Sequence, residues 1–318
     1  MKKLIINYIG YFTVLIGVIA YFGVSLYFKK EELGKIIFIG LLLVCFSMGY
    51  LKLRPKKSSA RFKLDKDVYL NILFVVIGGL FVYVLNDLLL IHTVLGSALV
   101  GVVGGLVFKK YEAAVFCGSF IGMTSPEVFN YPEFILVSTF GGILFVLVLD
   151  ILKGYGGKLG TTAFIFGFLF YFIFYNNPSP ATVFTNEQMM IIIICSSLAA
   201  WITYIFNVKF EMGPVLASGL IGLVIGITLV IEGSDFSLCL ASILFGATFV
   251  GMCSKDVCKP WFILTAGLLF GVVYIVMIPF GGLGGMLGTT ALISVVSLYG
   301  IKDTFNKVLL KFNKVLSK

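Results

Sequence analysis

The sequence predicts an all-α integral membrane protein of about 12 transmembrane spans, with two inverted-topology five-helix repeats and two peripheral N-terminal helices. Three observations lead to this prediction: a very apolar composition, apolar runs bounded by charge, and paired sequence blocks. The 318 residues are 59% hydrophobic and 12% charged, with a mean hydropathy of +1.07. Soluble domains are about 45–50% apolar and about 25% charged, so the bilayer must solvate most of this chain.

Composition also excludes several functional classes. The net charge of +9 does not indicate nucleic acid as a partner, because the basic residues lie at the ends of apolar runs. Four of the six cysteines lie inside such runs, and the other two lack a partner pair, so no metal or other cofactor is expected. The sequence has no P-loop, Rossmann, HExxH or GxSxG pattern, which argues against an enzyme.

Apolar runs bounded by charged or turn-forming residues define the expected spans. They are residues 4–28, 36–53, 68–92, 93–108, 113–125, 134–152, 162–176, 189–206, 214–232, 236–254, 261–280 and 289–300. The first run is longer than a signal-peptide core and lacks a small-residue cleavage site, so we expect a retained helix.

Basic residues predict the orientation of these spans. With the N-terminus in the cytoplasm, a basic loop (54–67) and a basic tail (301–318) both fall inside. Only Lys29, Lys30 and Lys35 of the 24 basic residues then lie outside. This asymmetry follows the positive-inside rule and predicts a multi-pass protein of the inner membrane with both termini cytoplasmic.

Three sequence blocks recur in the same order. YVLNDLLLIHTVLGSALVG from Tyr83 matches YIFNVKFEMGPVLASGLIG from Tyr204, FIGMTSPE from Phe120 matches FVGMCSKD from Phe249, and GGKLGTTAF from Gly156 matches GGMLGTTAL from Gly284. The blocks define repeats at 68–176 and 189–300, and five spans per repeat would invert the second. This organisation resembles, in architecture alone, that of sodium/proton antiporters and bile-acid-type symporters. The helix pair in residues 1–53 stands outside the symmetry.

Small residues recur at a spacing of four. Ser97, Gly101 and Gly105 have this spacing, and so do their counterparts in the second repeat, Ser218, Gly222 and Gly226. Such stripes allow helix backbones to approach closely, which predicts tight packing. A dedicated dimerisation face is the alternative, so a homo-oligomer stays open.

A glycine-rich segment precedes the last span of each repeat: GYGGKLGTT (154–162) in the first and GGLGGMLGTT (281–290) in the second. The helix from Thr162 to Asn176 would be about 21 Å long and that from Thr290 to Gly300 about 15 Å, against a hydrocarbon core of about 30 Å. We therefore expect both helices to begin inside the membrane, with threonine hydroxyls capping free N–H groups that face a solute. The alternative is a purely structural turn. The candidate binding residues are Gly157, Lys158, Gly160, Thr161, Thr162, Gly285, Gly288, Thr289 and Thr290.

Further polar residues recur in both repeats. Ser125 and Ser254 are candidate gating or binding groups, or else parts of helix-ending turns. Asn86 and Asn207 would contact solute or link helices through hydrogen bonds. Asp87 and Asp150 are the acids closest to membrane depth, and proton coupling through them is a weaker hypothesis.

These features together favour a permease that moves a small polar or anionic solute or ion across the lipid bilayer by alternating access. A passive channel of the same architecture is the first alternative. A non-transporting membrane enzyme or assembly subunit is the second.

Overall fold

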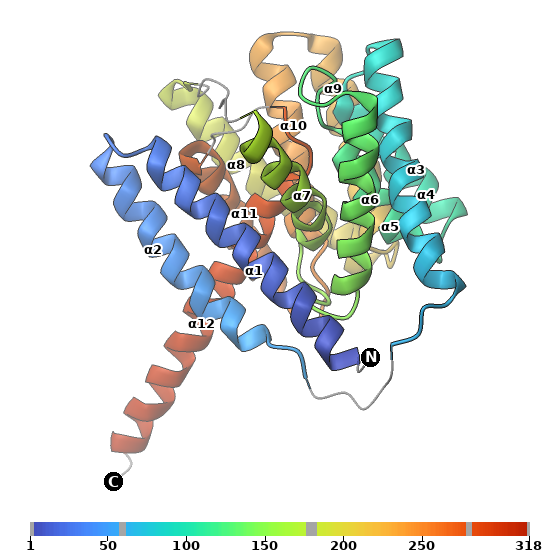
Figure 1. Ribbon diagram of the computed structural model, residues 1–318. Coiled ribbons are helices and arrows are strands. Elements are labelled where there is room, and N and C mark those ends of the chain that lie inside the picture. Colours follow the sequence, from blue (N-terminus) through green and yellow to red (C-terminus); the bar gives the residue numbers. More distant parts are fainter. Residues whose placement is uncertain (1–2, 57–61, 176–182, 278–281, 317–318) are drawn as a thin grey trace.

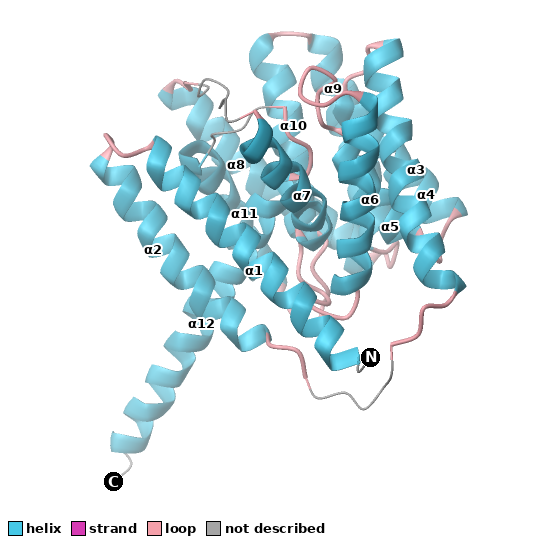
Figure 2. Ribbon diagram, viewed as in Figure 1, coloured by secondary structure: helices cyan, strands magenta, loops and turns pink. Residues whose placement is uncertain are grey.

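The computed structural model describes residues 3–56, 62–175, 183–277 and 282–316, and within these ranges the chain forms helices and no strand (Figure 2). The helices are α1 (Lys3–Phe28), α2 (Leu33–Tyr50), α3 (Lys66–Leu89), α4 (Thr93–Val107), α5 (Glu112–Gly122), α6 (Tyr131–Val148), α7 (Lys158–Phe174), α8 (Asn186–Tyr204), α9 (Pro214–Glu232), α10 (Asp235–Gly251), α11 (Pro260–Met277) and α12 (Met286–Leu316). A 3₁₀ turn (η1, Leu51–Leu53) extends α2, and a π-helical turn (η2, Ile205–Lys209) extends α8.

The lengths and composition of these helices fit a membrane protein. Among the described residues, seven helical segments are long and apolar enough to cross a membrane: α1, α2 with η1, α3, α6, α8 with η2, α9 and α11. The apolar helices α4, α5, α7 and α10 are shorter. The all-helical class is therefore confirmed.

Reciprocal side-chain bonds set the starts of α6 and α8. The Asn130 side chain accepts from the Glu133 N–H at 3.0 Å, and the Glu133 carboxylate accepts from the Asn130 N–H at 2.9 Å. Thr185 and Gln188 form the same arrangement at the start of α8. Each pair satisfies two N–H groups that have no partner within the helix, so these two boundaries are encoded locally.

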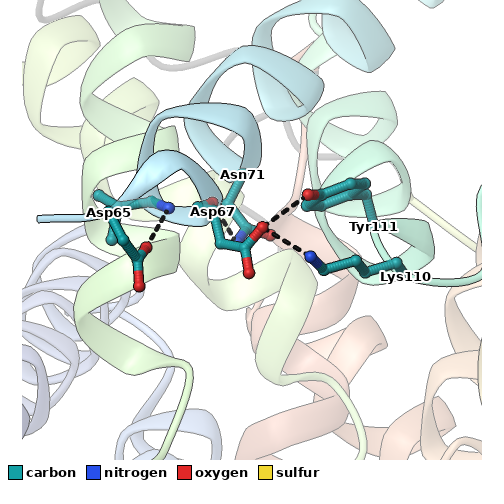
Figure 3. A network of polar contacts seen from close by, with 6 residues as sticks. Asp65, Asp67, Asn71, Lys110 and Tyr111 are labelled. Carbon is teal, nitrogen blue, oxygen red and sulfur yellow. Dashed lines mark hydrogen bonds and ion pairs between the residues drawn. The ribbon is translucent and has the colours of Figure 1, made fainter. Parts of the chain in front are cut away.

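The start of α3 is fixed both locally and by a tertiary contact. Asp65 accepts from the Val68 N–H and caps the helix, while the Asp67 carboxylate accepts from Lys110 Nζ at 2.6 Å and Tyr111 Oη at 2.8 Å (Figure 3). The Asn71 amide donates back to the Asp67 carbonyl in the same network. These bonds tie α3 to the turn between α4 and α5.

The last helix differs from the expectation. We expected the final span to end at Gly300, but α12 continues as one helix to Leu316 and projects from the bundle (Figure 1). A Cβ on Gly300 would lie 2.5 Å from the Cys45 carbonyl oxygen and 2.7 Å from the Gly49 nitrogen. Gly300 therefore allows α2 to pack closely on α12, and most of the basic tail continues the helix.

The two halves of the chain show corresponding helix contacts. In the first half α3 packs on α5 and α6, and in the second half α8 packs on α10 and α11. Between the halves, α4 lies along α9 and α7 contacts α12. The pair α1 and α2 borders the bundle through contacts of α1 with α6 and α7 and of α2 with α12 (Figure 1).

The small-residue stripes lie at these helix contacts. A Cβ on Gly101 of α4 would lie 3.0 Å from the Cα of Gly219 in α9, and one on Gly105 would lie 2.8 Å from the Leu216 Cβ. Gly222 of α9 also has no room for a side chain, because a Cβ there would lie 2.5 Å from the Phe245 ring. Close packing through small residues, predicted from the spacing, is confirmed.

Several loops rich in lysine and arginine gather at one end of the bundle. Contacts join them: Lys3 pairs with Asp150 at 2.5 Å, and the Ser254 N–H donates to the Gly154 carbonyl at 2.9 Å. We call this end the basic face. It comprises residues 52–56, 62–67, 108–112, 149–157, 205–213 and 252–259.

Candidate functional site

The two glycine-rich segments meet at the N-terminal turns of α7 and α12. A Cβ on Gly160 would lie 2.6 Å from the Cα of Gly288 and 3.2 Å from the Gly285 carbonyl oxygen. Real Cβ atoms essentially never show a contact as short as 2.6 Å, and a Cβ on Gly288 would lie only 2.4 Å from the Cα of Gly160, so both positions require glycine for the helices to touch backbone to backbone. Segments far apart in the sequence thus meet at equivalent positions in the two sequence blocks.

A left-handed glycine precedes each of these helices. Gly157 and Gly285 both have φ of +83°, a conformation that L side chains rarely adopt. Gly157 is the N-cap of α7, and because glycine has no side chain, the helix start has no side-chain cap. The chain therefore turns sharply into each helix, and the first turn starts at Lys158 or Met286, before the threonines.

The expectation that the threonines cap these helices is wrong. Thr161 Oγ1 donates to the Gly157 carbonyl at 3.0 Å, and Thr162 Oγ1 donates to the Lys158 carbonyl at 2.9 Å. Thr289 and Thr290 make the same bonds to the carbonyls four residues before them, and all four threonines are buried. Because the glycine turns end the loops earlier than expected, the threonines lie within the helices and not at their free N–H groups.

The recurrent serines join each half of the chain to the other. The Ser125 N–H donates to the Gly282 carbonyl at 2.8 Å, and the Ser254 N–H donates to the Gly154 carbonyl at 2.9 Å. The residues beside them repeat the arrangement. Thr124 Oγ1 accepts from the Gly284 N–H at 3.0 Å, and Cys253 Sγ accepts from the Gly156 N–H at 3.2 Å.

The two asparagines hold helix ends together. Asn207 Nδ2 donates to the carbonyls of Gly251 at 3.1 Å and Cys253 at 3.0 Å, which joins η2 to the end of α10. Asn86 Nδ2 donates to the Ile91 carbonyl at 3.3 Å, within the connection between α3 and α4. Of the two roles considered for these amides, a hydrogen-bonded link to another helix is present for Asn207, whereas the Asn86 bond is local, five residues along the chain.

Lys158 is the one charged candidate, and its ammonium contacts the end of α6. Nζ donates to the carbonyls of Leu149 at 3.1 Å and Ile151 at 2.9 Å. An ammonium group has three N–H donors, so these two bonds leave capacity for one more. Lys158 therefore holds the loop between α6 and α7 against the helix that follows it.

A cavity of about 350 Å³ brings some of the candidates together at the basic face. We call it the glycine cavity; its walls include the candidates Gly157, Lys158, Gly160, Asn207 and Ser254. The remaining candidates are Asn86, Ser125, Thr161, Thr162, Gly285, Gly288, Thr289 and Thr290, and none of them lines this cavity.

Sequence reasoning missed two polar residues in the same walls. Glu112, the first residue of α5, and Tyr155, in the loop before α7, both line the glycine cavity. An acid in the first turn of a helix is common because it complements the helix dipole, so Glu112 carried no functional signal. Tyr155 adjoins the glycine-rich segment, and its position beside Gly154 was the available clue.

The acids considered for proton coupling are not isolated. Asp150 lies beyond the end of α6 and pairs with Lys3 at 2.5 Å and Lys153 at 2.6 Å. Asp87 accepts from Tyr131 Oη at 2.7 Å near the end of α3. In the described part of the chain, no group of three His, Cys, Asp or Glu side chains could hold a metal ion.

Comparison with protein-family models, curated proteins and solved structures finds no match to this chain.

Proposed function

We propose that the chain is a permease, a secondary transporter that moves a small polar or anionic solute by alternating access between two inverted repeats. The observation that carries the proposal is the relation between the glycine cavity and the crossing of α7 and α12. The cavity reaches Gly160, and Gly160 touches Gly288 of the other half. A solute in the cavity would thus lie against the contact between the halves, where transporters of this architecture bind their substrates.

The paired contacts support the internal repeat on which the proposed inversion depends. Tyr83 Oη donates to the Phe129 carbonyl, and Tyr204 Oη donates to the Cys258 carbonyl, so the same bond occurs once in each half. Ser97 bonds Ser119 at 2.8 Å, and Ser218 bonds Thr248 at 2.7 Å. Because corresponding residues form corresponding bonds, the two halves would share one internal structure and exchange roles during transport.

The closed crossing favours a carrier over a channel. Thr161 and Thr289, one position beyond the touching glycines, are buried and bond carbonyls four residues before them, and Thr161 Oγ1 also donates to the Gly288 carbonyl across the crossing at 3.4 Å. A passive channel needs a continuous polar path across the membrane. Here the backbone contact between Gly160 and Gly288 would block a path that leads onward from the glycine cavity. Movement of one half against the other would open this contact from the opposite side.

The cavity walls indicate the chemistry of the solute. Lys158 and Glu112 supply opposite charges, while Asn207 and Ser254 supply neutral polar groups. Phe120, Val215 and Phe249 form apolar parts of the same walls. A volume of about 350 Å³ is at the small end of ligand sites, so a small anion or zwitterion is the proposed solute.

Side-specific labelling tests alternating access. Ser254→Cys and its counterpart Ser125→Cys, each in a cysteine-free background, are treated with a membrane-impermeant maleimide from one side of the membrane at a time. Ser254→Cys should react only from the basic face and Ser125→Cys only from the opposite face. A solute that raises one rate should lower the other.

Two results would contradict the carrier. Reaction of both positions from the same side would remove the inversion. Reaction of each from both sides, together with solute flux that does not saturate, would support the channel instead. The inner-membrane location with both termini cytoplasmic belongs to the same proposal and is tested separately below.

A further inference from the structure

A second cavity lies beside the first at the basic face. It has a volume of about 740 Å³ and is bounded by the start of α1, the segment after α2, the loop between α6 and α7, and Tyr299 of α12. We call it the lysine cavity. Leu152 and Tyr155 line both cavities, so the loop between α6 and α7 separates them.

Positive charge dominates the lysine cavity. Its walls contain five basic side chains and one acidic side chain: Lys3, Lys52, Arg54, Lys56, Lys153 and Asp150. Asp150 pairs with Lys3 and Lys153, and Lys52 pairs with Asp303 at 2.6 Å. Within the described ranges, no carboxylate pairs with Arg54 or Lys56.

The cavity is open to the surface, and Lys52, Arg54, Lys56 and Lys153 are exposed. The Asp150 side chain is 25% exposed and lies deeper, between Lys3 and Lys153. Arg54 interacts with the hydroxyl of Tyr11, which is itself buried and donates to the Tyr50 carbonyl at 2.9 Å. The guanidinium is thus anchored by α1 and α2 at the edge of the cavity.

We propose that the lysine cavity binds a phosphate-bearing anion. Cations that line a partly enclosed space repel one another, and a bound anion offsets that repulsion. A guanidinium matches two phosphate oxygens at once, and ammonium groups complete the shell as point charges. Asp150 limits the affinity of the site for an anion, because its carboxylate forms ion pairs with two of the cations, Lys3 and Lys153.

Two sources can supply this chemistry: the headgroup of an anionic phospholipid or a soluble phosphate compound. The cavity lies at the ends of the apolar helices α1 and α2, where lipid headgroups would be found in a membrane. Basic pockets between helices at such a surface are known to bind phosphorylated headgroups. The binding experiment therefore carries one arm for each source.

The experiment uses the purified full-length chain in a neutral detergent and measures binding by isothermal calorimetry. The probes are a short-chain phosphatidylglycerol, inorganic pyrophosphate, and a short-chain phosphatidylcholine as the uncharged reference. We expect saturable binding of phosphatidylglycerol, of pyrophosphate or of both, and none of phosphatidylcholine. Tighter binding of the lipid assigns a headgroup as ligand, and tighter binding of pyrophosphate assigns a soluble anion.

Matched variants locate the binding. The double variant Arg54→Gln/Lys153→Gln should weaken binding about tenfold or more, since each substitution removes a charge-assisted hydrogen bond from the protein to the anion. Lys255→Gln/Lys259→Gln removes the same charge from the same face outside the cavity and should leave the affinity unchanged. Asp150→Asn should strengthen binding several-fold by releasing Lys3 and Lys153, a gain that misfolding cannot imitate.

The proposal fails if neither phosphate probe binds saturably. It fails equally if the two double variants weaken binding to the same extent, because the charge would then act diffusely. Unchanged or weaker binding by Asp150→Asn would also overturn it. Since none of these measurements uses transport, their outcome is independent of the proposed permease activity.

Discussion

Gly160 and Gly288 occupy equivalent places in two sequence blocks and touch each other, with the Cα of Gly288 2.6 Å from where a Cβ of Gly160 would lie. This contact joins α7 to α12, and Gly160 also lines the glycine cavity. It also explains why both blocks carry glycine two residues after the helix start. A side chain at either position would separate the helices.

Alanine at Gly160 or Gly288 should destabilise the protein by about 1–3 kcal/mol, because a methyl group has no room between the two backbones. The matched control is Gly40→Ala in α2, where nothing lies within 4 Å of the added Cβ. That variant should be neutral or stabilised by up to about 1 kcal/mol through its higher helix propensity. Thermal unfolding in detergent measures all three, and equal stability of the three variants would refute the close contact.

Valine at Thr162 should change stability by less than about 1 kcal/mol, because the Thr162 hydroxyl bonds the Lys158 carbonyl, which already belongs to the backbone ladder of the same helix. Solute uptake in proteoliposomes should also stay near that of the parent. Strong loss of uptake by a normally folded Thr→Val variant would show that the hydroxyl contacts solute after all.

Lys158→Met should destabilise the protein by about 1–3 kcal/mol, because the carbonyls of Leu149 and Ile151 lose their donor. Lys153→Met is the control, since Lys153 is 67% exposed and its ion pair with Asp150 should contribute at most about 1 kcal/mol. If Lys158 also binds an anionic solute, uptake of that solute should fall further than uptake of a neutral one. Equal melting temperatures for the two variants would contradict the structural role.

Membrane topology can be tested with three single-cysteine variants in a cysteine-free background. Lys63→Cys and Lys307→Cys should react with an impermeant thiol reagent from one side of the membrane, the cytoplasmic side. Glu187→Cys, near the start of α8, should react only from the other side. Labelling of Glu187→Cys and Lys63→Cys from the same side would break the inverted repeat.

Asp150 should show a specific dependence on pH. Burial opposes its ionisation, but hydrogen bonds from Lys153 and Lys3 outweigh burial and hold its pKa below the ordinary 3.8. A lowered pKa stabilises the fold above the unfolded value and loses that effect as the pH falls through the folded value. The difference in melting temperature between the parent and Asp150→Asn should thus be constant from about pH 8 to about pH 5 and shrink below about pH 4. A difference that grows on acidification would have the wrong sign.

Local chemistry determined much of the fold. Apolar runs bounded by charge predicted where helices form, because the bilayer requires every backbone group of a span to bond within its own helix. Small residues spaced by four predicted close contacts, and Gly101 and Gly222 lie in such contacts. The capping boxes at Asn130 and Thr185 also follow from residues three positions apart.

Only the tertiary structure decided the roles of individual polar groups. Thr161 and Thr162 looked like caps, but the left-handed turn at Gly157 starts the helix before them. Gly300 resembled a helix end, yet α2 packs on it and α12 continues. The sequence by itself determined which segments are helical and which recur, since those properties depend on neighbouring residues. Which side chains share a cavity, as Lys158 does with Glu112, depends on how distant helices pack, and no local pattern contains that information.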